Sequence, residues 1–489
     1  MDLDRAGSVP LYRQLYDELR GAILSGRMAG GARLPSTRGL AAELGVARLT
    51  VLEAFEQLYA DGYVEGRSGS GAYVVRELPS DVLRAPPDRA PGASLAAAGR
   101  LLSRRGAILA ATPMPIPTVT RPRAFVPGIP GLEDFPFDLW RRLMAKQWRR
   151  APVDRMLYGD PAGYRPLREA IAAYLGAARG VRCHADQIVV VGCSQQALDL
   201  AARLLVDEGD AVWMEDPGYP GARGAFIAAG ARLIPVPVDD EGLDVERGAA
   251  LAKDARLVYV TPSHQFPLSV TMSLTRRLIL LEHAARHGLW VLEDDYDSEY
   301  QYSGRPLTAL HGLDRAGRVI YVGSFSKVLF PAVRIGYLVL PPDLVEPFVT
   351  ARALALGHGS LIEQAVVADF IAEGHFTRHL RRMRGLYAER HAALVEAASR
   401  DLAGRLDVRR TETGIHLVGW LPEGTDDRPI AQRAAAAGII ARPVSSFRTG
   451  TIGRPGLVLG FAAVRPPEIR DAMQRLAAAF PASAGARST

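Results

Sequence analysis

Apolar residues follow two different periods along this chain, and the change between them divides it. After about residue 125 they come in short continuous runs separated by helical patterns, which is typical of an α/β domain whose strands are covered on both faces. The expected strands are Ile188–Val191, Ala211–Met214, Leu233–Val236, Leu257–Thr261, Leu289–Leu292, Val319–Val322 and Tyr337–Leu340, with helices such as Ser194–Leu205 and Thr275–His287 between them. Near the N-terminus, by contrast, apolar residues recur at every fourth position of Pro10–Gly26, at Leu11, Leu15, Leu19 and Ile23. That spacing predicts an amphipathic helix.

The residues after this first helix predict a winged helix-turn-helix. Ser36 can cap a second helix that runs through Leu44, and Gly45 can adopt the tight turn that follows it. A third helix is expected over 47–61, and its first turn is the part that usually meets base edges in the major groove. Residues 63–75 then read as two strands around a glycine-rich tip, which is the wing.

Composition and charge limit the classes of protein that this chain can belong to. Its 489 residues are too many for one hydrophobic core and indicate two to four domains. With 48% hydrophobic and 23% charged residues it is expected to be globular, and a net charge of +6 permits nucleic-acid binding. The two cysteines, Cys183 and Cys193, lack metal-ligand spacing, so no metal site is expected. No apolar stretch has the length of a membrane span or a signal peptide, which favours a cytoplasmic protein without a membrane partner.

A segment rich in proline, alanine and arginine separates the two patterns. Eight prolines between residues 79 and 122 make a compact fold there unfavourable and an extended linker the natural reading, with one short helix over Leu95 to Ala111. We therefore expect a DNA-binding domain over 1–76, a linker over 77–123 and an effector domain over 124–489.

The chemistry of the body centres on Lys327, in the stretch Gly323-Ser324-Phe325-Ser326-Lys327, directly after an expected strand. A lysine at a strand end, flanked by hydroxyls and followed by Arg334, can hold an aldehyde as a Schiff base beside a phosphate. These are the contacts that bind pyridoxal 5′-phosphate (PLP). Ser324, Ser326 and Arg334 are the expected phosphate ligands beside Lys327.

Other strand ends offer the remaining groups that PLP needs. Ser194 and Gln195 open a helix whose positive end favours a phosphate, and Tyr219 can stack on the pyridine ring. Asp294 can keep the pyridine nitrogen protonated, and Tyr296 can hydrogen-bond the phenolic oxygen. Each has an ordinary structural interpretation as well: a helix cap, a turn aromatic or a solvated strand end. Their joint occurrence at strand ends favours the cofactor.

The head resembles the GntR family of bacterial regulators. The resemblance rests on Leu34-Pro35-Ser36-x-Arg38, on Leu44-Gly45-Val46-x-Arg48-x-Thr50-Val51 and on the glycines of the wing. It implies that the head binds double-stranded DNA through residues that contact phosphates and base edges, and Leu49 is unusual where polar residues are common. The alternative is a protein-binding module whose arginines are simply solvated. The implied DNA contacts are Ser36, Arg38, Arg48, Thr50, Arg67 and Gly69.

The body resembles class I and II aminotransferases of fold type I, and the whole chain is similar to the MocR subfamily of GntR regulators, which includes GabR-like activators. Tyr158-Gly159-Asp160-Pro161-x-Gly163-Tyr164 and the stretch from Thr261 to Pro267 carry this resemblance. It implies an α/β body with a mixed, mostly parallel sheet, PLP as cofactor, and a small amino compound or PLP as effector. It also implies a head-to-tail, domain-swapped homodimer.

Two departures from working aminotransferases bear on function. Phe266 stands where they usually place an asparagine beside the cofactor oxygen, and Val458 takes the place of the arginine that clamps a substrate carboxylate. Arg442 or Arg448 is the expected effector contact in its stead. We interpret the chain as a PLP-dependent transcriptional regulator that senses its effector through Schiff-base chemistry at Lys327. The alternatives are an active aminotransferase with a DNA-binding head, and a body that only dimerises and binds no cofactor.

Overall fold

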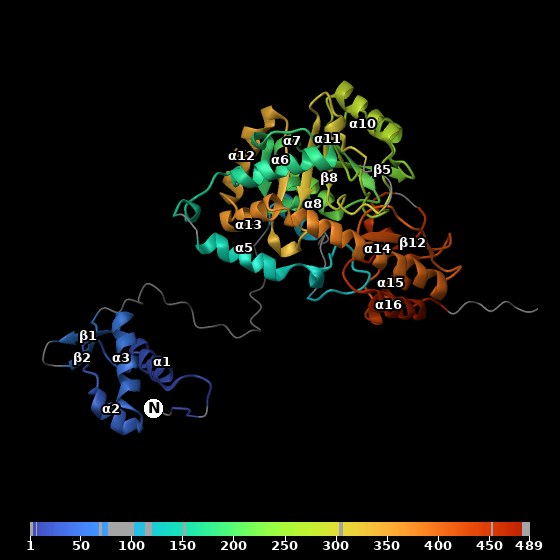
Figure 1. The fold of residues 1–489 in the computed structure, drawn as a ribbon. Coiled ribbons are helices and arrows are strands. Elements are labelled where there is room, and N and C mark those ends of the chain that lie inside the picture. The colour runs from blue at the N-terminus through green and yellow to red at the C-terminus, as the bar shows by residue number, and fades with distance from the viewer. Residues whose placement is uncertain are drawn as a thin grey trace, which may run out of the picture. The chain divides into compact units, whose positions relative to one another are not determined.

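The computed structural model describes residues 3–5, 7–67, 71–76, 102–112, 120–149, 153–302, 307–450 and 453–481. The chain divides into two compact units, 1–101 and 102–489, called here the head and the body (Figure 1). No helix among these residues is long and apolar enough to cross a membrane.

The head consists of three helices and one β-hairpin. Ser36 caps the second helix, because its Oγ accepts a hydrogen bond of 3.0 Å from the Gly39 N–H, and Gly45 ends that helix at φ +62°. Of the side chains that the four-residue period predicted, Leu15, Leu19 and Ile23 are buried and Leu11 is half-buried. The three buried ones pack with apolar side chains of the third helix, so the winged helix-turn-helix is confirmed. Its elements are α1 (Leu11–Leu24), α2 (Thr37–Leu44), α3 (Arg48–Ala60), β1 (Val64–Arg67) and β2 (Gly71–Val74).

An eight-stranded sheet forms the centre of the body. Its order is β3-β10-β9-β8-β7-β4-β5-β6, and within it β10 runs antiparallel to both neighbours while β4, β5, β7, β8 and β9 pair in parallel. The expected mixed, mostly parallel sheet is confirmed. The strands are β3 (Ile188–Val191), β4 (Ala211–Asp216), β5 (Arg232–Asp239), β6 (Gly242–Leu243), β7 (Leu257–Val260), β8 (Trp290–Asp295), β9 (Val319–Ser324) and β10 (Gly336–Val339).

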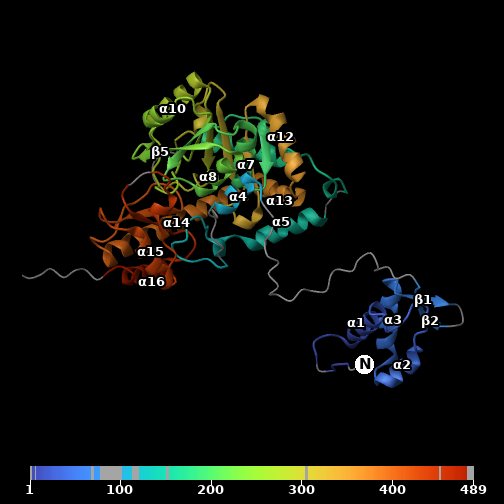
Figure 2. The same ribbon diagram turned by 180° about the vertical axis from the view of Figure 1, so that it is seen from behind.

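Helices surround this sheet, and one of them comes from the segment that was expected to be a linker. Within the expected linker, the helix begins at Arg104 rather than earlier, because Ser103 caps it by accepting from the Gly106 N–H at 3.0 Å; residues 95–101 lie outside the described part of the chain. This helix, α4, packs on α8 (Figure 2). The helices of the body are α4 (Arg104–Ala111), α5 (Phe137–Arg149), α6 (Arg165–Arg179), α7 (Ser194–Leu205), α8 (Pro220–Ala229), α9 (Val245–Leu251), α10 (Leu274–His287), α11 (Leu310–Leu313), α12 (Pro342–Leu356), α13 (Leu361–Ala372), α14 (His375–Asp401), α15 (Asp427–Ala436) and α16 (Pro466–Ala478).

A second, four-stranded antiparallel sheet lies in the C-terminal part of the body, where α14 packs against α16 (Figure 1). The strands expected from the apolar runs of the sequence did not include it. They are β11 (Asp407–Val408), β12 (His416–Trp420), β13 (Arg442–Pro443) and β14 (Gly456–Gly460), in the order β11-β12-β14-β13.

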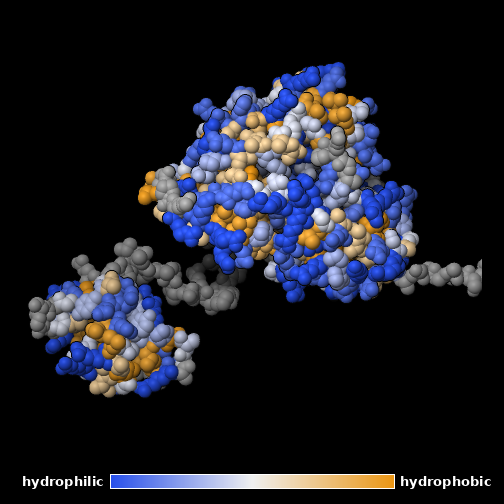
Figure 3. Space-filling view, viewed as in Figure 1, coloured by the Kyte–Doolittle hydropathy of each residue, from blue (hydrophilic) through white to orange (hydrophobic). Residues whose placement is uncertain are grey.

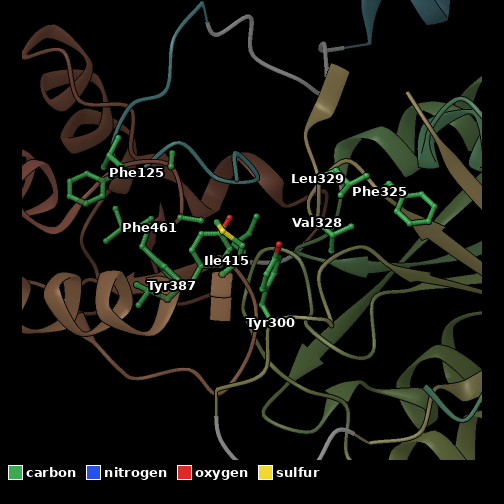
Figure 4. Close-up of a cluster of buried hydrophobic side chains, with 14 of the residues drawn as sticks. Phe125, Tyr300, Phe325, Val328, Leu329, Tyr387, Ile415 and Phe461 are labelled. Carbon is green, nitrogen blue, oxygen red and sulfur yellow. The ribbon is translucent and has the colours of Figure 1, made fainter. Parts of the chain in front are cut away.

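One hydrophobic cluster joins the two sheets and fixes the loop that carries Lys327. The side chains on both sides of this lysine, Phe325 and Val328, are 3% and 1% exposed and belong to that cluster. Because they are anchored, the lysine between them is held at a defined place. Figure 4 shows part of the cluster, in which the labelled side chains are Phe125, Tyr300, Phe325, Val328, Leu329, Tyr387, Ile415 and Phe461.

Candidate cofactor pocket and DNA-binding face

The polar residues predicted as a pocket follow strands that end at one edge of the large sheet. β3 and β9 are both antiparallel to β10, so they run parallel to each other and to β8, β7 and β4. Their carboxyl ends therefore meet at the same edge, which is where open α/β sheets bind ligands.

Lys327 lies three residues beyond the end of β9 and is held by its surroundings. Its Nζ donates a hydrogen bond of 2.8 Å to the backbone oxygen of Gly128. Burial lowers the pKa of Lys327 from its usual 10.5, and the negative charges of Asp297 and Asp294 act in the opposite direction. A lowered pKa makes the neutral, nucleophilic amine more abundant near neutral pH.

Asp294 on β8 lies close enough to this lysine for their charges to interact. Its Oδ2 accepts a hydrogen bond of 2.8 Å from the Tyr259 hydroxyl, whereas Oδ1 has no partner among the described residues. Burial raises the pKa of Asp294 to about 7, although the Tyr259 hydrogen bond lowers it. A buried carboxyl with one unpartnered oxygen is suited to a protonated ring nitrogen.

The N-terminus of α7 and the end of β3 form a site suited to an anion. Ser194 is the first residue of α7, and the preceding Cys193 offers no side-chain cap to the free N–H groups. The Arg334 side chain is exposed and has no hydrogen-bond partner among the described residues; a Cβ built on Gly192 would lie 3.9 Å from its Nη2. Helix dipole and guanidinium therefore converge on one place.

The other predicted phosphate ligands lie at the same strand ends, with part of their hydrogen-bonding capacity already used. Gln195 Nε2 donates to the Gly221 oxygen at 2.8 Å, and its Oε1 is buried without a partner among the described residues. Ser324 Oγ accepts from the Ser326 N–H at 3.1 Å.

The aromatic residues predicted for the ring and its phenolic oxygen lie around Phe266. The rings of Tyr219 and Tyr296 contact the Phe266 ring edge-on, with centroids 5.8 and 6.3 Å away. The Tyr296 hydroxyl donates to the backbone oxygen of His264 at 2.9 Å. The unpartnered Asp294 oxygen, the uncapped α7 and the exposed guanidinium thus fit the ring nitrogen and the phosphate of PLP.

The residues considered for effector binding lie beside a cluster of buried apolar side chains. Val458 on β14 is fully buried and packs in a cluster with Phe447 and Phe266. Arg442 stands opposite Val458 in the register of β13 and β14 and is half-buried, which lowers its pKa. Arg448 Nη2 donates to the Arg454 oxygen at 2.9 Å, so its guanidinium is partly engaged by the backbone.

Sequence reasoning missed several residues of this region. His264 falls inside the stretch from Thr261 to Pro267 and Asp297 directly follows the predicted Tyr296, so a signal was close by in the sequence. Gly128, Tyr259 and His416 carried none, because each reaches the pocket through a fold contact between distant parts of the chain.

The predicted DNA contacts of the head lie at the start of α2 and α3. Arg38 and Arg48 are exposed, and Arg48 Nε lies 3.4 Å from Thr37 Oγ1, which links the two helices. Thr50 is half-buried, and the Ser36 hydroxyl serves as a helix cap. Arg67 is the last residue of β1, its side chain is not described, and Gly69 lies outside the described residues.

The same face exposes hydrophobic side chains. Figure 3 shows hydrophobic residues on the visible surface of the head. On α3, Leu49 is 62% exposed and Leu52 is 39% exposed. Helical spacing places Leu52 on the same face as Arg48, and places Leu49 on the side of the helix away from the buried Val51 and Leu58.

Comparison with known proteins agrees with this division. Residues 11–74 match the GntR family of bacterial regulatory proteins, and residues 132–476 match the class I and II aminotransferase family. The chain is 43% identical to a Rhizobium meliloti protein named as the probable rhizopine catabolism regulatory protein MocR, over 98% of this chain and 95% of that protein. It is 32% identical to the transcriptional regulator TauR of Rhodobacter capsulatus, with 97% of each covered. The body is similar to the α-aminoadipate aminotransferase LysN of Thermus thermophilus, solved with N-(5′-phosphopyridoxyl)-L-leucine, at TM-score 0.68 and 31% identity over 73% of this chain and 91% of that one.

A GntR-type winged helix joined to a body of the class I and II aminotransferase fold defines a class of PLP-binding transcriptional regulators. DNA is the partner of such a head, and PLP is the cofactor of such a body. The chain belongs to the MocR subfamily of these regulators. The expected family, fold class and cofactor are therefore confirmed.

Proposed function

We propose that this regulator holds PLP through Lys327 Nζ and senses an amino compound, or PLP itself, by reaction at that atom. PLP supplies an aldehyde that amines capture reversibly as a Schiff base, and a ring that withdraws electrons when protonated. The observation that carries the proposal is a half-buried lysine at a sheet edge whose amine has a lowered pKa and interacts with the charge of Asp294, a carboxyl with one oxygen unpartnered among the described residues.

Each remaining residue of the pocket has a chemical role in this proposal. Asp294 holds a proton on the ring nitrogen, and its raised pKa means that burial makes a cationic partner favourable. Tyr219 and Tyr296 contact the ring and its phenolic oxygen. The phosphate is bound by Ser194, Gln195, Ser324, Ser326 and Arg334, together with the N-terminus of α7.

The head supplies the readout by binding an operator in double-stranded DNA. Exposed arginines at the starts of α2 and α3 support contacts with phosphates and base edges. The residues assigned to DNA are Ser36, Arg38, Arg48, Thr50, Arg67 and Gly69. The domain limits in this proposal are 1–76 for the DNA-binding domain, 77–123 for the linker and 124–489 for the effector domain.

A homodimer, arranged head to tail with exchanged heads, completes the proposal. The body exposes large apolar side chains of a kind that soluble monomers usually cover: Val153, Met156, Leu157 and Tyr158 are 74%, 63%, 60% and 94% exposed. A symmetric dimer presents two heads to paired half-sites. Replacement of the Lys327 amine by an effector amine then favours one conformation of the body over another and changes how the heads meet DNA.

Borohydride reduction followed by peptide mapping tests the proposal directly. The chain has three lysines, Lys146, Lys253 and Lys327, so the label has few possible positions. Lys146 is paired with Asp369 at 2.8 Å, and Lys253 is exposed. After reduction of the PLP-loaded full-length protein, the label is expected on Lys327 and absent from a Lys327→Ala variant. Label on Lys253 or Lys146 alone, or no label, overturns the proposal.

A further inference from the structure

Two buried histidines beside the candidate pocket have ring nitrogens without a partner. His264 and His416 are each 1% exposed, and their ring centroids are 4.6 Å apart. Within the described parts of the chain, the Nε2 atoms of both rings lack a hydrogen-bond partner. A buried polar atom left unsatisfied costs about 1–3 kcal/mol. Two such atoms side by side therefore require an explanation.

Whether Nε2 can accept a hydrogen bond depends on whether the other ring nitrogen, Nδ1, carries the proton. His264 Nδ1 lies 3.1 and 2.9 Å from the two oxygens of Asp297. A carboxylate only accepts, so Nδ1 carries the proton, and in this tautomer Nε2 presents a lone pair.

His416 presents a lone pair for a similar reason. Its ring hydrogen-bonds the backbone of Pro267, and a proline offers only its carbonyl oxygen, so the His416 ring is the donor. Because Nε2 has no partner, this donor is Nδ1. Burial lowers the pKa of His416 well below its usual 6.5, so the ring is neutral and its Nε2 is an acceptor.

The pair adjoins Lys327 and the aromatic wall. The charge of Lys327 contributes to the lowered pKa of His416, and Asp297, the partner of His264, is the carboxylate with the largest effect on Lys327. The Phe266 ring lies 5.4 Å from that of His416. The pair therefore lies close enough to Lys327 for the charges of Lys327 and of Asp297 to act between them.

Apolar side chains also surround the two rings. Val418, Val444 and Val458 pack with Phe447 in the cluster that includes Phe266. Val418 lies two residues after His416 on β12, and Val458 on β14 is the register partner of Val418. A carboxylate brought here would meet two lone pairs and an apolar wall.

We propose that His264 and His416 form a subsite for a hydrogen-bond donor, a hydroxyl or an amine, at the end of the effector away from its reacting amino group. The inference rests on the proposed function and names the class of effector: amino alcohols and diamines rather than amino acids. Asp297 is a positioning residue, because it orients His264 without reaching the ligand.

Spectral titration of the PLP-loaded full-length protein tests this subsite. The probes are alkylamines, amino alcohols, diamines and ω-amino acids of graded and matched chain length. The cofactor absorption spectrum reports the reaction at Lys327. At the matching length, the amino alcohol or the diamine is expected to bind about tenfold more tightly than the alkylamine, as one hydrogen bond to a buried acceptor gives. The relative response to alcohol and diamine distinguishes the two donors.

Variants of His416 test whether the preference for amino alcohols or diamines over alkylamines depends on the ring nitrogen. His416→Phe keeps an aromatic ring without a lone pair and is expected to abolish the preference, whereas His416→Gln retains an acceptor and part of the preference. His283→Phe is the matched control: its Nε2 also lacks a partner, but its ring lies on α10 with its centroid 5.0 Å from that of Trp213. The control is expected to keep the wild-type preference.

The outcomes separate this inference from the proposed function. If no amine changes the spectrum and Lys327 remains unlabelled by borohydride, the proposed function fails and the inference falls with it. If amines react but donors bind no more tightly than alkylamines, or the preference survives in His416→Phe, only the inference fails. The nearest ligand atoms of His264, Asp297 and His416 lie within 4.8 Å of one another. Zinc that copurifies with the protein and is lost from His416→Phe also overturns it.

Discussion

The side-chain amine of Lys327 donates a hydrogen bond of 2.8 Å to the backbone oxygen of Gly128, which lies 199 residues earlier in the chain. Gly128 follows Phe125, whose backbone pairs with Gly460 at 3.0 and 3.1 Å, so this segment is fixed to the C-terminal sheet. The hydrogen bond therefore places the reacting amine of Lys327 against a segment that is fixed to the C-terminal sheet.

Gly128→Ala is expected to impair PLP capture. A Cβ at this position would lie 2.9 Å from Lys327 Nζ, and the backbone has φ +77°, which disfavours any side chain. Because the lysine must shift, the rate of PLP binding should fall. Absorbance of the cofactor measures this rate. Gly209→Ala is the matched control, with φ +92° and no atom within 4 Å of its Cβ. It should lower stability by about 1 kcal/mol and leave PLP capture unchanged. Equal effects of the two variants would show that backbone strain alone is responsible.

Arg334→Gln is expected to weaken binding of PLP but not of pyridoxal, which lacks the phosphate. Loss of a charge-assisted hydrogen bond should lower PLP affinity about 10-fold to 100-fold. The exposed site makes a change in folding stability small. Arg203→Gln, at the opposite end of α7 and paired with Asp199 at 2.9 Å, is the control. Fluorescence titration with both ligands measures the effect, and an equal loss for PLP and pyridoxal would refute the phosphate role.

How much of this site the sequence could predict depends on the distance between contacting residues. The strand ends were predictable, because strands covered on both faces are continuous apolar runs, and α7 has the expected bounds, Ser194–Leu205. The contact of Lys327 with Gly128 was not, since it depends on how the chain returns across the fold. The same holds for the position of His416 beside His264.

Asp294 makes the stability of the PLP-free protein fall as pH rises. Its pKa is about 7 in the folded protein against an ordinary 3.8, so the folded state binds the proton more tightly than the unfolded chain. The stabilisation by this proton is complete below pH 3.8 and is lost as pH rises from 3.8 to about 7. Asp294→Asn, which cannot titrate, should therefore match the wild type near pH 3.8 and be more stable above pH 7, by on the order of 4 kcal/mol.

Urea unfolding across this pH range measures the Asp294 effect. Tyr259→Phe supplies a second check, because the Tyr259 hydrogen bond lowers the pKa of Asp294. Its removal should move the upper end of the window to higher pH. A wild-type protein and an Asp294→Asn variant with parallel pH profiles would contradict the assignment.

Leu49 and Val51 should separate DNA affinity from stability. Leu49 is 62% exposed on α3, whereas Val51 is fully buried. Leu49→Ala should change the free energy of unfolding by less than about 0.5 kcal/mol. Val51→Ala should lower it by about 2 kcal/mol through loss of packing. If α3 enters the major groove, as we propose, its exposed leucine can contact thymine methyl groups. Affinity of the wild type for a DNA site selected from a random library should therefore fall when deoxyuridine replaces thymidine. Leu49→Ala should not respond to that replacement. Fluorescence anisotropy at two salt concentrations measures both, and equal sensitivity of the two proteins to deoxyuridine would rule out this contact.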